Sequence, residues 1–389
     1  MHENILRQQS AFLKTHGVAM TTSELRHTVS TVLALQTLYY EDPISEARVE
    51  FNDPDFWRDL SPGNSADPTQ LAFALSSLAR PSEIVSAPNN ASAHLLCEQG
   101  YAIGVPPPPS SRICALCASL VQLLAQLEAA GLPPQFLFVY NAPWLLLEEQ
   151  WSSALLTGIL GWDSVMEADM NCWALRKPTT PSSSLSPLSF PSSRAPSYIG
   201  ANFGESHRDQ RYSSCHTSDG QPTSLNVWIP FNASGATALN GAMRVLPIPQ
   251  DAFYFSPTHL AHMDTSISLA QAVTQSAAAS AVLECSTGTA CVWSPALVHW
   301  GGSCSAESPV EPRASIAATF RMKSALPSVF GSGNGGGESS SASATGPPPL
   351  VRGDLFSLSL PRRLAYVAKS LLSYSHWHPG FPGIRLAAA

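Results

Sequence analysis

The sequence predicts a mainly β protein with flanking helices (α+β), whose core is an antiparallel barrel or sandwich such as a jelly roll. Helix-like segments come first along the chain, and short runs of apolar and β-branched residues follow them. Turn signals such as Asn240-Gly241 separate these runs. Several short strands after a helical region are typical of closed or two-layered antiparallel β folds. The predicted strands span residues 225–231, 242–248, 289–294 and 315–322.

The helices are predicted from apolar spacing and from their end signals. Ser110 and Ser111 can cap a helix over 112–130, which Gly131 and the following Pro133-Pro134 would end. Two further short strands are expected at 136–140 and 171–177. The remaining helices are expected after a turn at 53–60 and over 145–160, 266–281 and 362–374.

Composition shifts along the chain predict its domain organisation. A helical extension is expected over 1–95 and the domain that carries the chemistry over 96–326. A Pro/Ser-rich stretch over 178–199 predicts an exposed insertion loop in that domain, because this composition does not form a packed core. A Gly/Ser-rich linker is expected over 327–350 and a helical tail over 351–389.

Charge and composition exclude several classes of partner. The chain has 389 residues, a formal charge of −7 and 44% apolar residues, which predicts a globular protein without the basic excess that nucleic-acid binding requires. No run reads as a membrane span, and the N-terminus lacks the apolar core of a signal peptide. A cytoplasmic protein that acts on a small molecule is expected, with organelle targeting and oligomeric state left open. Cys114 and Cys117 are expected to be buried and reduced.

The most informative motif is His207-Arg208-Asp209. Side chains at positions i and i+2 of a strand point to the same face, so His207 and Asp209 can reach one metal ion. His299 follows 92 residues after His207, at the end of an apolar run. Two histidines and one carboxylate form the facial triad of non-haem Fe(II) oxygenases, which leaves coordination positions open.

A candidate anion anchor follows the second histidine. Arg313 and Ser315 begin the last predicted strand and share a face of it. A planar guanidinium pairs with a carboxylate through two parallel hydrogen bonds, so Arg313 is suited to hold an anionic cosubstrate. Ser315 can donate a second hydrogen bond.

These motifs, in this order, resemble a known family. The segments HRD, LNVWIPFNASGATALNGAMRVLP, GTACVWSPALVHWGG and RAS look like the phytanoyl-CoA dioxygenase-like branch of the iron- and 2-oxoglutarate-dependent oxygenases. The resemblance covers about residues 96–325 and implies a double-stranded β-helix (a jelly-roll, cupin-like core). The family pattern differs at Gly301, where many members carry serine.

The resemblance also implies a mechanism and roles for six residues. Fe(II) would be bound by His207, Asp209 and His299, and 2-oxoglutarate by Arg313 with Ser315 as helper. Trp228 matches an aromatic residue that lines the family's cosubstrate pocket. O₂ and 2-oxoglutarate would be converted to succinate, CO₂ and a hydroxylated product, since relatives that halogenate lack the carboxylate that Asp209 provides. The substrate is left open.

Two other functions fit the same residues. One is a non-catalytic binding protein that retains the β-helix, and the other is a cupin-type metalloenzyme that does not use 2-oxoglutarate. Arg313 could be an ordinary surface cation, and a histidine in an apolar run is commonly a core residue. Two other groups compete as metal sites: His259, His262 and Asp264, and the pair His376 and His378.

Overall fold

Two antiparallel sheets form the centre of the protein in the computed structural model. The structure describes residues 51–76, 90–105, 110–175, 206–275, 279–305, 307–309, 311–326 and 347–373. The chain divides into two units, Met1–Asp53 with Ala389 and Pro54–Ala388, and every element named below belongs to the second unit. The expected insertion loop over 178–199, most of the expected linker, and the pair His376 and His378 lie outside the described residues.

The larger sheet has seven strands and the smaller has three. The larger runs in the order β1 (Tyr101–Val105), β7 (Ala290–Trp293), β4 (Ser224–Pro230), β9 (Arg313–Arg321), β2 (Val165–Met166), β10 (Leu350–Val351), and β3 (Asn171–Leu175) also pairs with β9. The smaller runs in the order β6 (Ala281–Val282), β5 (Met243–Val245), β8 (His299–Gly301). Each of these strand pairs is antiparallel, as the sequence predicts.

Strand β9 shows how the sequence divides its side chains between two environments. Arg313, Ala317 and Thr319 line a pocket on one face of the sheet. The alternate residues point the other way, where the Phe320 ring lies 5.3 Å from that of Trp151.

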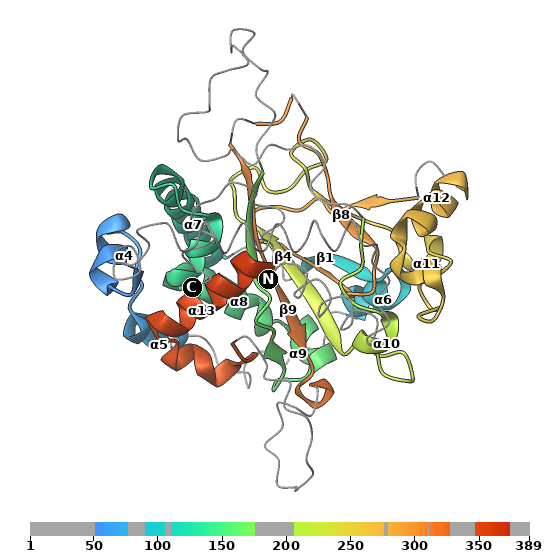
Figure 1. Ribbon diagram of the computed structural model, residues 1–389, viewed down its shortest axis with the longest axis horizontal. Coiled ribbons are helices and arrows are strands. Elements are labelled where there is room, and N and C mark those ends of the chain that lie inside the picture. The colour runs from blue at the N-terminus through green and yellow to red at the C-terminus, as the bar shows by residue number, and fades with distance from the viewer. Residues whose placement is uncertain are drawn as a thin grey trace, which may run out of the picture. The chain divides into compact units, whose positions relative to one another are not determined.

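Helices flank the strands on two sides (Figure 1). On one side are α4 (Pro54–Leu60), α5 (Pro68–Ser76), α7 (Ser111–Ala129), α8 (Asn141–Trp151) and α13 (Leu360–Ser373). On the other are α6 (Asn90–Gln99), α10 (Tyr212–Cys215), α11 (Leu260–Met263) and α12 (Thr265–Gln275). Short helices α9 (Ala154–Leu160), η2 (Pro134–Val139), η3 (Ile248–Gln250), η4 (Lys323–Ala325) and η6 (Arg352–Ser357) complete the described elements.

Helix α7 begins and ends where its sequence predicts. The Ser110 side chain accepts a hydrogen bond from the Ile113 backbone N–H, and Gly131 has φ +72°, the left-handed conformation that ends a helix. Length and hydropathy alone would let α7 cross a membrane, contrary to the expectation from the sequence. Six of its side chains, including Leu120 and Leu124, are instead buried in the protein, as in a core helix.

Two sequence predictions in this region are wrong. Residues expected to form a strand at 136–140 belong to the 3₁₀ helix η2, because Pro133 and Pro134 fix backbone angles that suit the start of a helical turn. The helix expected over 145–160 is two helices, α8 and α9. Ser153 separates them by accepting a hydrogen bond from the Leu156 backbone N–H, which caps α9.

The surface shows one further departure from expectation. Cys117 is buried as predicted, but Cys114, one turn earlier on α7, is exposed.

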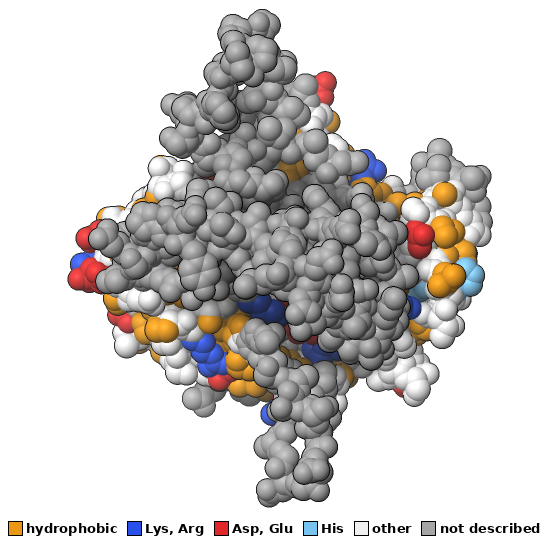
Figure 2. All heavy atoms as spheres, in the orientation of Figure 1, with side chains coloured by type: hydrophobic (Ala, Val, Ile, Leu, Met, Phe, Trp, Pro, Cys, Tyr) orange, Lys and Arg blue, Asp and Glu red, His pale blue; other side chains and the backbone are white. Residues whose placement is uncertain are grey.

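Exposed apolar side chains gather near α11 and α12, at the right of Figure 2, where Leu260 and Ile267 are 89% and 45% exposed. Acidic and basic side chains lie beside one another on α4, where Arg58 pairs with Asp55.

Candidate metal centre

Backbone pairing brings the two histidines of the predicted triad together. His207 forms an isolated antiparallel bridge with His299 at the start of β8, through N–H···O=C bonds of 3.0 and 2.9 Å. The imidazole rings project from this bridge with centroids 4.4 Å apart. The Asp209 backbone N–H donates to the Pro295 carbonyl, which holds the carboxylate beside both rings.

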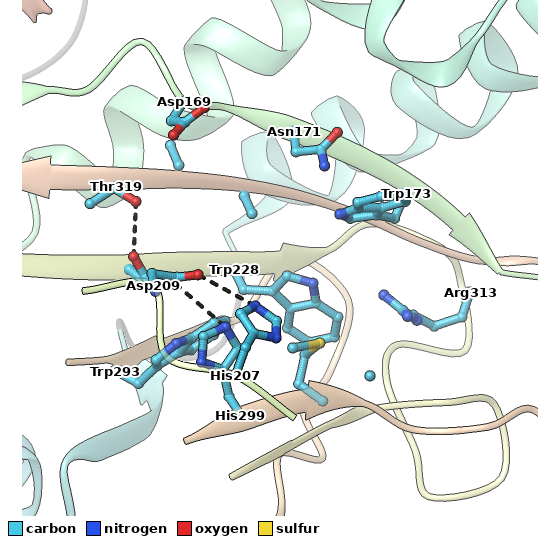
Figure 3. Close-up of a pocket in the computed structure, with 15 residues that line it drawn as sticks. Asp169, Asn171, Trp173, His207, Asp209, Trp228, Trp293, His299, Arg313 and Thr319 are labelled. Carbon is cyan, nitrogen blue, oxygen red and sulfur yellow. Dashed lines mark hydrogen bonds and ion pairs between the residues drawn. The ribbon is translucent and has the colours of Figure 1, made fainter. Parts of the chain in front are cut away.

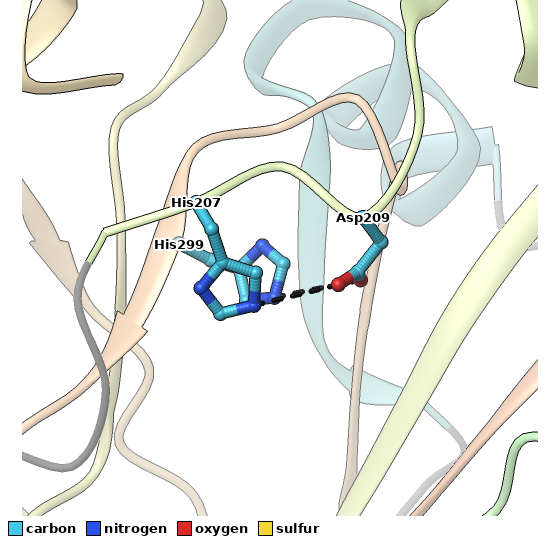
Figure 4. Close-up of side chains that lie close together, drawn as sticks. All are labelled: His207, Asp209 and His299. Carbon is cyan, nitrogen blue, oxygen red and sulfur yellow. Dashed lines mark ion pairs between the residues drawn. The ribbon is translucent and has the colours of Figure 1, made fainter. Parts of the chain in front are cut away.

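The three predicted ligands converge on one point (Figure 4). His207 Nε2 lies 3.4 Å from Asp209 Oδ1, and His299 Nε2 lies 3.5 Å from Asp209 Oδ2. One ligand atom from each residue lies within 4.8 Å of the others. The His299 side chain is 5% exposed, whereas those of His207 and Asp209 are 48% and 38% exposed. One side of the site is therefore fixed in the core and the other is open to incoming molecules.

Hydrogen bonding and burial prepare His299 to act as a ligand. Its Nδ1 lies 3.0 Å from the Leu297 carbonyl, which only a protonated Nδ1 can satisfy, so the Nε2 lone pair faces the site. Burial lowers the pKa of His299, although the charge of Asp209 opposes this shift. The neutral imidazole, which is the form that binds metals, is therefore favoured.

Asp209 is held in its ionised form. Burial would raise the pKa of Asp209, but His299, His207 and a hydrogen bond from Asn226 outweigh it and lower the pKa to about 2. The Asn226 amide N–H donates to Asp209 Oδ2 over 2.5 Å. The Asn226 carbonyl in turn accepts from the Thr319 hydroxyl over 2.8 Å. Because Asn226 and Thr319 lie directly opposite each other on β4 and β9, sheet register fixes this chain of bonds.

The Thr319–Asn226 pair determines which way the Asn226 amide faces. With its carbonyl held by Thr319, the amide N–H must point at the carboxylate, and the opposite orientation would place two oxygens in contact. We expect Asn226→Leu to weaken Fe(II) binding by about 10- to 100-fold, the usual effect of losing a partner that orients a ligand. Anaerobic Fe(II) titration measures this.

The hydroxyl of Thr319 provides the matched control for that prediction. Thr319→Ser keeps the hydroxyl and is expected to bind Fe(II) as the wild type does, while Thr319→Val is expected to weaken binding. Equal affinity in all of these variants would show that the bonds to Asp209 do not orient it.

A pocket of about 120 Å³ opens from the triad between the two sheets (Figure 3). Residues of the larger sheet line one wall, and Met243, His299 and Gly301 of the smaller sheet line another. Asp169 and Thr319 lie toward one end of the pocket in Figure 3, and Arg313 lies at the other. In Figure 3 Asp209 lies beside Thr319, and the two histidine rings lie between Asp209 and Arg313.

Arg313 is a buried cation without an acidic partner among the described residues. It is 1% exposed, and its Nη1 donates to Ser315 Oγ over 2.8 Å. Its Nε and Nη2 have no hydrogen-bond acceptor. Burial lowers the pKa of Arg313 to about 10, which the nearby Cys304, Cys285 and Cys172 thiols partly oppose. Since a buried unpaired charge is costly, an anion in the pocket would complete this site.

The other predicted pocket residues lie as follows. The Trp228 ring lies 5.2 Å from the Arg313 guanidinium carbon, and its indole N–H has no acceptor. Ser315 is fully buried and does not line the pocket, so in this structure it contacts the site through Arg313. Trp293, whose indole N–H is also without an acceptor, lines the pocket beside His299.

Nearby residues that competed as site candidates have structural partners. Arg208 is buried and paired with Asp251 at 2.7 Å, so it does not face the pocket. His262 is buried, with Nδ1 2.8 Å from the Phe253 carbonyl and Nε2 accepting from the Tyr212 N–H. His259 accepts from the Ala261 N–H at the start of α11. These bonds occupy both ring nitrogens of His262 and the Nδ1 of His259.

Several polar or aromatic residues of the pocket were missed by reasoning from sequence. Asn226 and Thr319 could have been found from the sequence, because each lies an even number of residues from a predicted site residue on the same strand and so points to the same face. Asn226 shares its face with Trp228, and Thr319 shares its face with Arg313. Trp293 also lies on a predicted strand. Trp173 lies on the strand predicted over 171–177, but its place in the pocket depends on the pairing of β3 with β9. The position of Asp169, before that strand, could not be predicted from any local pattern.

Comparisons with known proteins give distant structural likenesses only. No protein-family model matches the chain, and no curated protein matches its sequence. Similar solved structures include a nickel complex of the non-heme monooxygenase ThoJ and EctD from S. alaskensis with bound Fe. A third is SnoK, described as a non-heme alpha ketoglutarate dependent carbocyclase from nogalamycin biosynthesis.

These three structures are far from the chain in sequence. They are 15%, 16% and 11% identical to it, with TM-scores of 0.36, 0.38 and 0.37. The matches cover 59%, 61% and 63% of this chain and 76%, 78% and 85% of the other chains. At these TM-scores the likenesses carry no argument about this chain's activity.

Proposed function

We propose that this protein is a non-haem Fe(II)- and 2-oxoglutarate-dependent dioxygenase that hydroxylates a C–H bond of a small molecule. One observation carries the proposal. The ligand atoms of His207, Asp209 and His299 converge at a pocket whose far end holds the buried guanidinium of Arg313, which has no acidic partner among the described residues. A metal site and an anion site in one pocket suit a cosubstrate such as 2-oxoglutarate, which must contact a metal ion with one end and a cationic side chain with the other.

The arrangement of the strands supports a double-stranded β-helix as the fold of this domain. The larger and smaller antiparallel sheets both contribute side chains to the one pocket. His207 and His299 join at an edge of the smaller sheet, whereas Arg313 lies on the larger sheet. In this interpretation the sheets are the two halves of the β-helix and the pocket is its interior.

The donor set fits Fe(II). Two imidazoles and one carboxylate on the same side of an ion leave positions open for other ligands. The lone pair of His299 and the ionised carboxylate of Asp209 are in the forms that bind metal. Bound Fe(II), with 2-oxoglutarate and O₂, supplies the oxidising chemistry, in which the cosubstrate becomes succinate and CO₂ and a substrate C–H becomes C–OH.

The protein's own residues bind and orient the cosubstrate. The two free N–H groups of Arg313 can donate to one carboxylate, while Ser315 holds its third nitrogen in place. The Trp228 ring lies beside the guanidinium and excludes water from it. Since Asp209 is oriented by Asn226 through one oxygen, its other oxygen stays available to the metal.

The first experiment is anaerobic addition of Fe(II) and 2-oxoglutarate to the full-length protein. A visible metal-to-ligand charge-transfer band, followed by O₂-dependent formation of succinate, is the expected result. Bound iron without the band would instead support a metalloenzyme of the cupin type that does not use 2-oxoglutarate. Failure to bind any metal would support a non-catalytic binding protein.

A further inference from the structure

Among the described residues that line the pocket, Asp169 carries the one carboxylate that belongs neither to an ion pair nor to the metal ligand set. Its Oδ1 is buried, and within the described parts of the chain this oxygen accepts no hydrogen bond and the carboxylate forms no ion pair. It lines the same pocket as the triad, on the segment between β2 and β3 (Figure 3). Its oxygens are not among the ligand atoms that lie within 4.8 Å of one another, so it is outside the metal's ligand set.

Two acids close to Asp169 or to the triad each have a cationic partner. Glu167, two residues earlier, pairs with Arg321, and Asp251 pairs with Arg208. An unpaired carboxylate whose oxygen is withdrawn from water is costly, and such groups are usually paired or bind a ligand. Asp169 therefore differs from these two acids in needing a partner from outside the protein.

Charge balance in the loaded pocket indicates the sign of that partner. A divalent metal and Arg313 bring three positive charges, and Asp209 and a dicarboxylate cosubstrate bring three negative ones. Asp169 and Asp209 are the acids among the described residues that line the pocket, and Arg313 is the cation. One negative charge, that of Asp169, is left without a counter-charge once metal and cosubstrate are bound.

We propose that Asp169 is a substrate-binding residue that pairs with an ammonium group, so that the substrate of this enzyme is an organic amine. This inference rests on the proposed function, because the charge balance includes the metal and the cosubstrate. Thr319 lies toward the same end of the pocket as Asp169 in Figure 3, and Asn171 lies between that end and Arg313, so both add polar groups to the wall near Asp169.

The size of the pocket limits how much of the substrate it holds. At about 120 Å³ it is well below the roughly 300–1,000 Å³ of sites that enclose a drug-sized ligand. With the cosubstrate bound toward Arg313, the space left on the Asp169 side suits an ammonium group and the adjoining carbon atoms, and the rest of the substrate would lie toward the open side. The bond that is oxidised is then a C–H close to the ammonium group.

Three probes of equal length test the proposal: n-butylammonium, n-butanol and butyrate. Binding is measured by saturation-transfer NMR on the full-length protein loaded with Zn(II), which is diamagnetic, and 2-oxoglutarate. Wild type is expected to bind butylammonium at least about tenfold more tightly than butanol, a difference of about 1.4 kcal/mol, and to bind butyrate most weakly. Asp169→Asn, which keeps the shape of the side chain, is expected to lose this preference.

Glu167→Gln is the matched control, because Glu167 is in the same segment but does not line the pocket. It is expected to keep the preference for butylammonium. Equal binding of all probes by wild type, or an unchanged preference in Asp169→Asn, would overturn the inference. If the loaded protein binds 2-oxoglutarate normally, either result leaves the proposed function intact. If wild type does not bind 2-oxoglutarate, the proposed function and this inference fail together.

Discussion

Replacing His299 with alanine is expected to lower the affinity for Fe(II) by more than about a hundred-fold, because even the loss of a partner that only orients a ligand costs 10- to 100-fold. His299 is the most buried of the three candidate ligands, and its tautomer is fixed by the Leu297 carbonyl. No described histidine or carboxylate joins the three within 4.8 Å, so none stands ready to replace it. Anaerobic equilibrium dialysis with Fe(II) measures the loss.

His259→Ala is the control for this experiment. His259 does not line the pocket; it accepts a backbone hydrogen bond at the start of α11 and its ring stacks on that of Phe253. Its removal is expected to leave Fe(II) affinity unchanged. Tight Fe(II) binding by His299→Ala, or an equal loss in His259→Ala, would contradict the assignment of the triad.

Replacing Arg313 with methionine is expected to produce opposite effects on binding and on stability. The affinity for 2-oxoglutarate should fall by about a hundred-fold or more, since truncating one partner of a buried charge pair costs about 2–5 kcal/mol. The free energy of unfolding of the metal-free protein should stay the same or rise. Arg313 is buried without an acidic partner in the described structure, so methionine removes an uncompensated charge while filling much of its volume.

Arg208 is the control for this experiment, because it is buried like Arg313 but has an acidic partner. Comparing the two variants separates the effect of an unpaired charge from the effect of burial alone. Arg208 is equally enclosed but paired with Asp251, and its side chain also donates to the carbonyls of His262 and Ala296. Arg208→Met is expected to lower the free energy of unfolding by about 3–5 kcal/mol, as when one member of a buried ion pair is removed. Denaturant unfolding measures both variants. A similar loss of stability in Arg313→Met would mean that Arg313 supports the fold instead of a ligand.

That His207 and Asp209 lie close together could be predicted from the sequence because strand geometry is simple, whereas His299 was added from the order of the motifs along the chain. Alternation puts His207 and Asp209 on one face wherever the local backbone is extended, and no knowledge of neighbouring strands is needed. The same rule placed Arg313 on the face of β9 that lines the pocket. The antiparallel pairing and the strands β3, β4, β7 and β9 were also predictable from β-branched runs between turn signals.

Features that depend on contacts between distant segments could not be predicted in this way. Nothing in the run Phe136-Leu-Phe-Val-Tyr140 separates a buried strand from a buried helical turn, and the preceding prolines decided the outcome. The bond from Asn226 to Asp209 requires the register of β4 on β9. The position of Asp169 requires the path of the chain between β2 and β3, which no local pattern encodes.

The bridge between His207 and His299 has a consequence for folding. An ion bound there would act as a non-covalent cross-link that closes a loop of 92 residues, and this loop contains β4, β5, β6 and β7. Loading of the metal and closure of the two sheets are then linked equilibria, each favouring the other. At free metal a hundred times its dissociation constant, the linkage contributes about 2.7 kcal/mol to the folded state. The ion that would serve the chemistry would thus also stabilise the pairing of His207 with His299, and with it the folded domain.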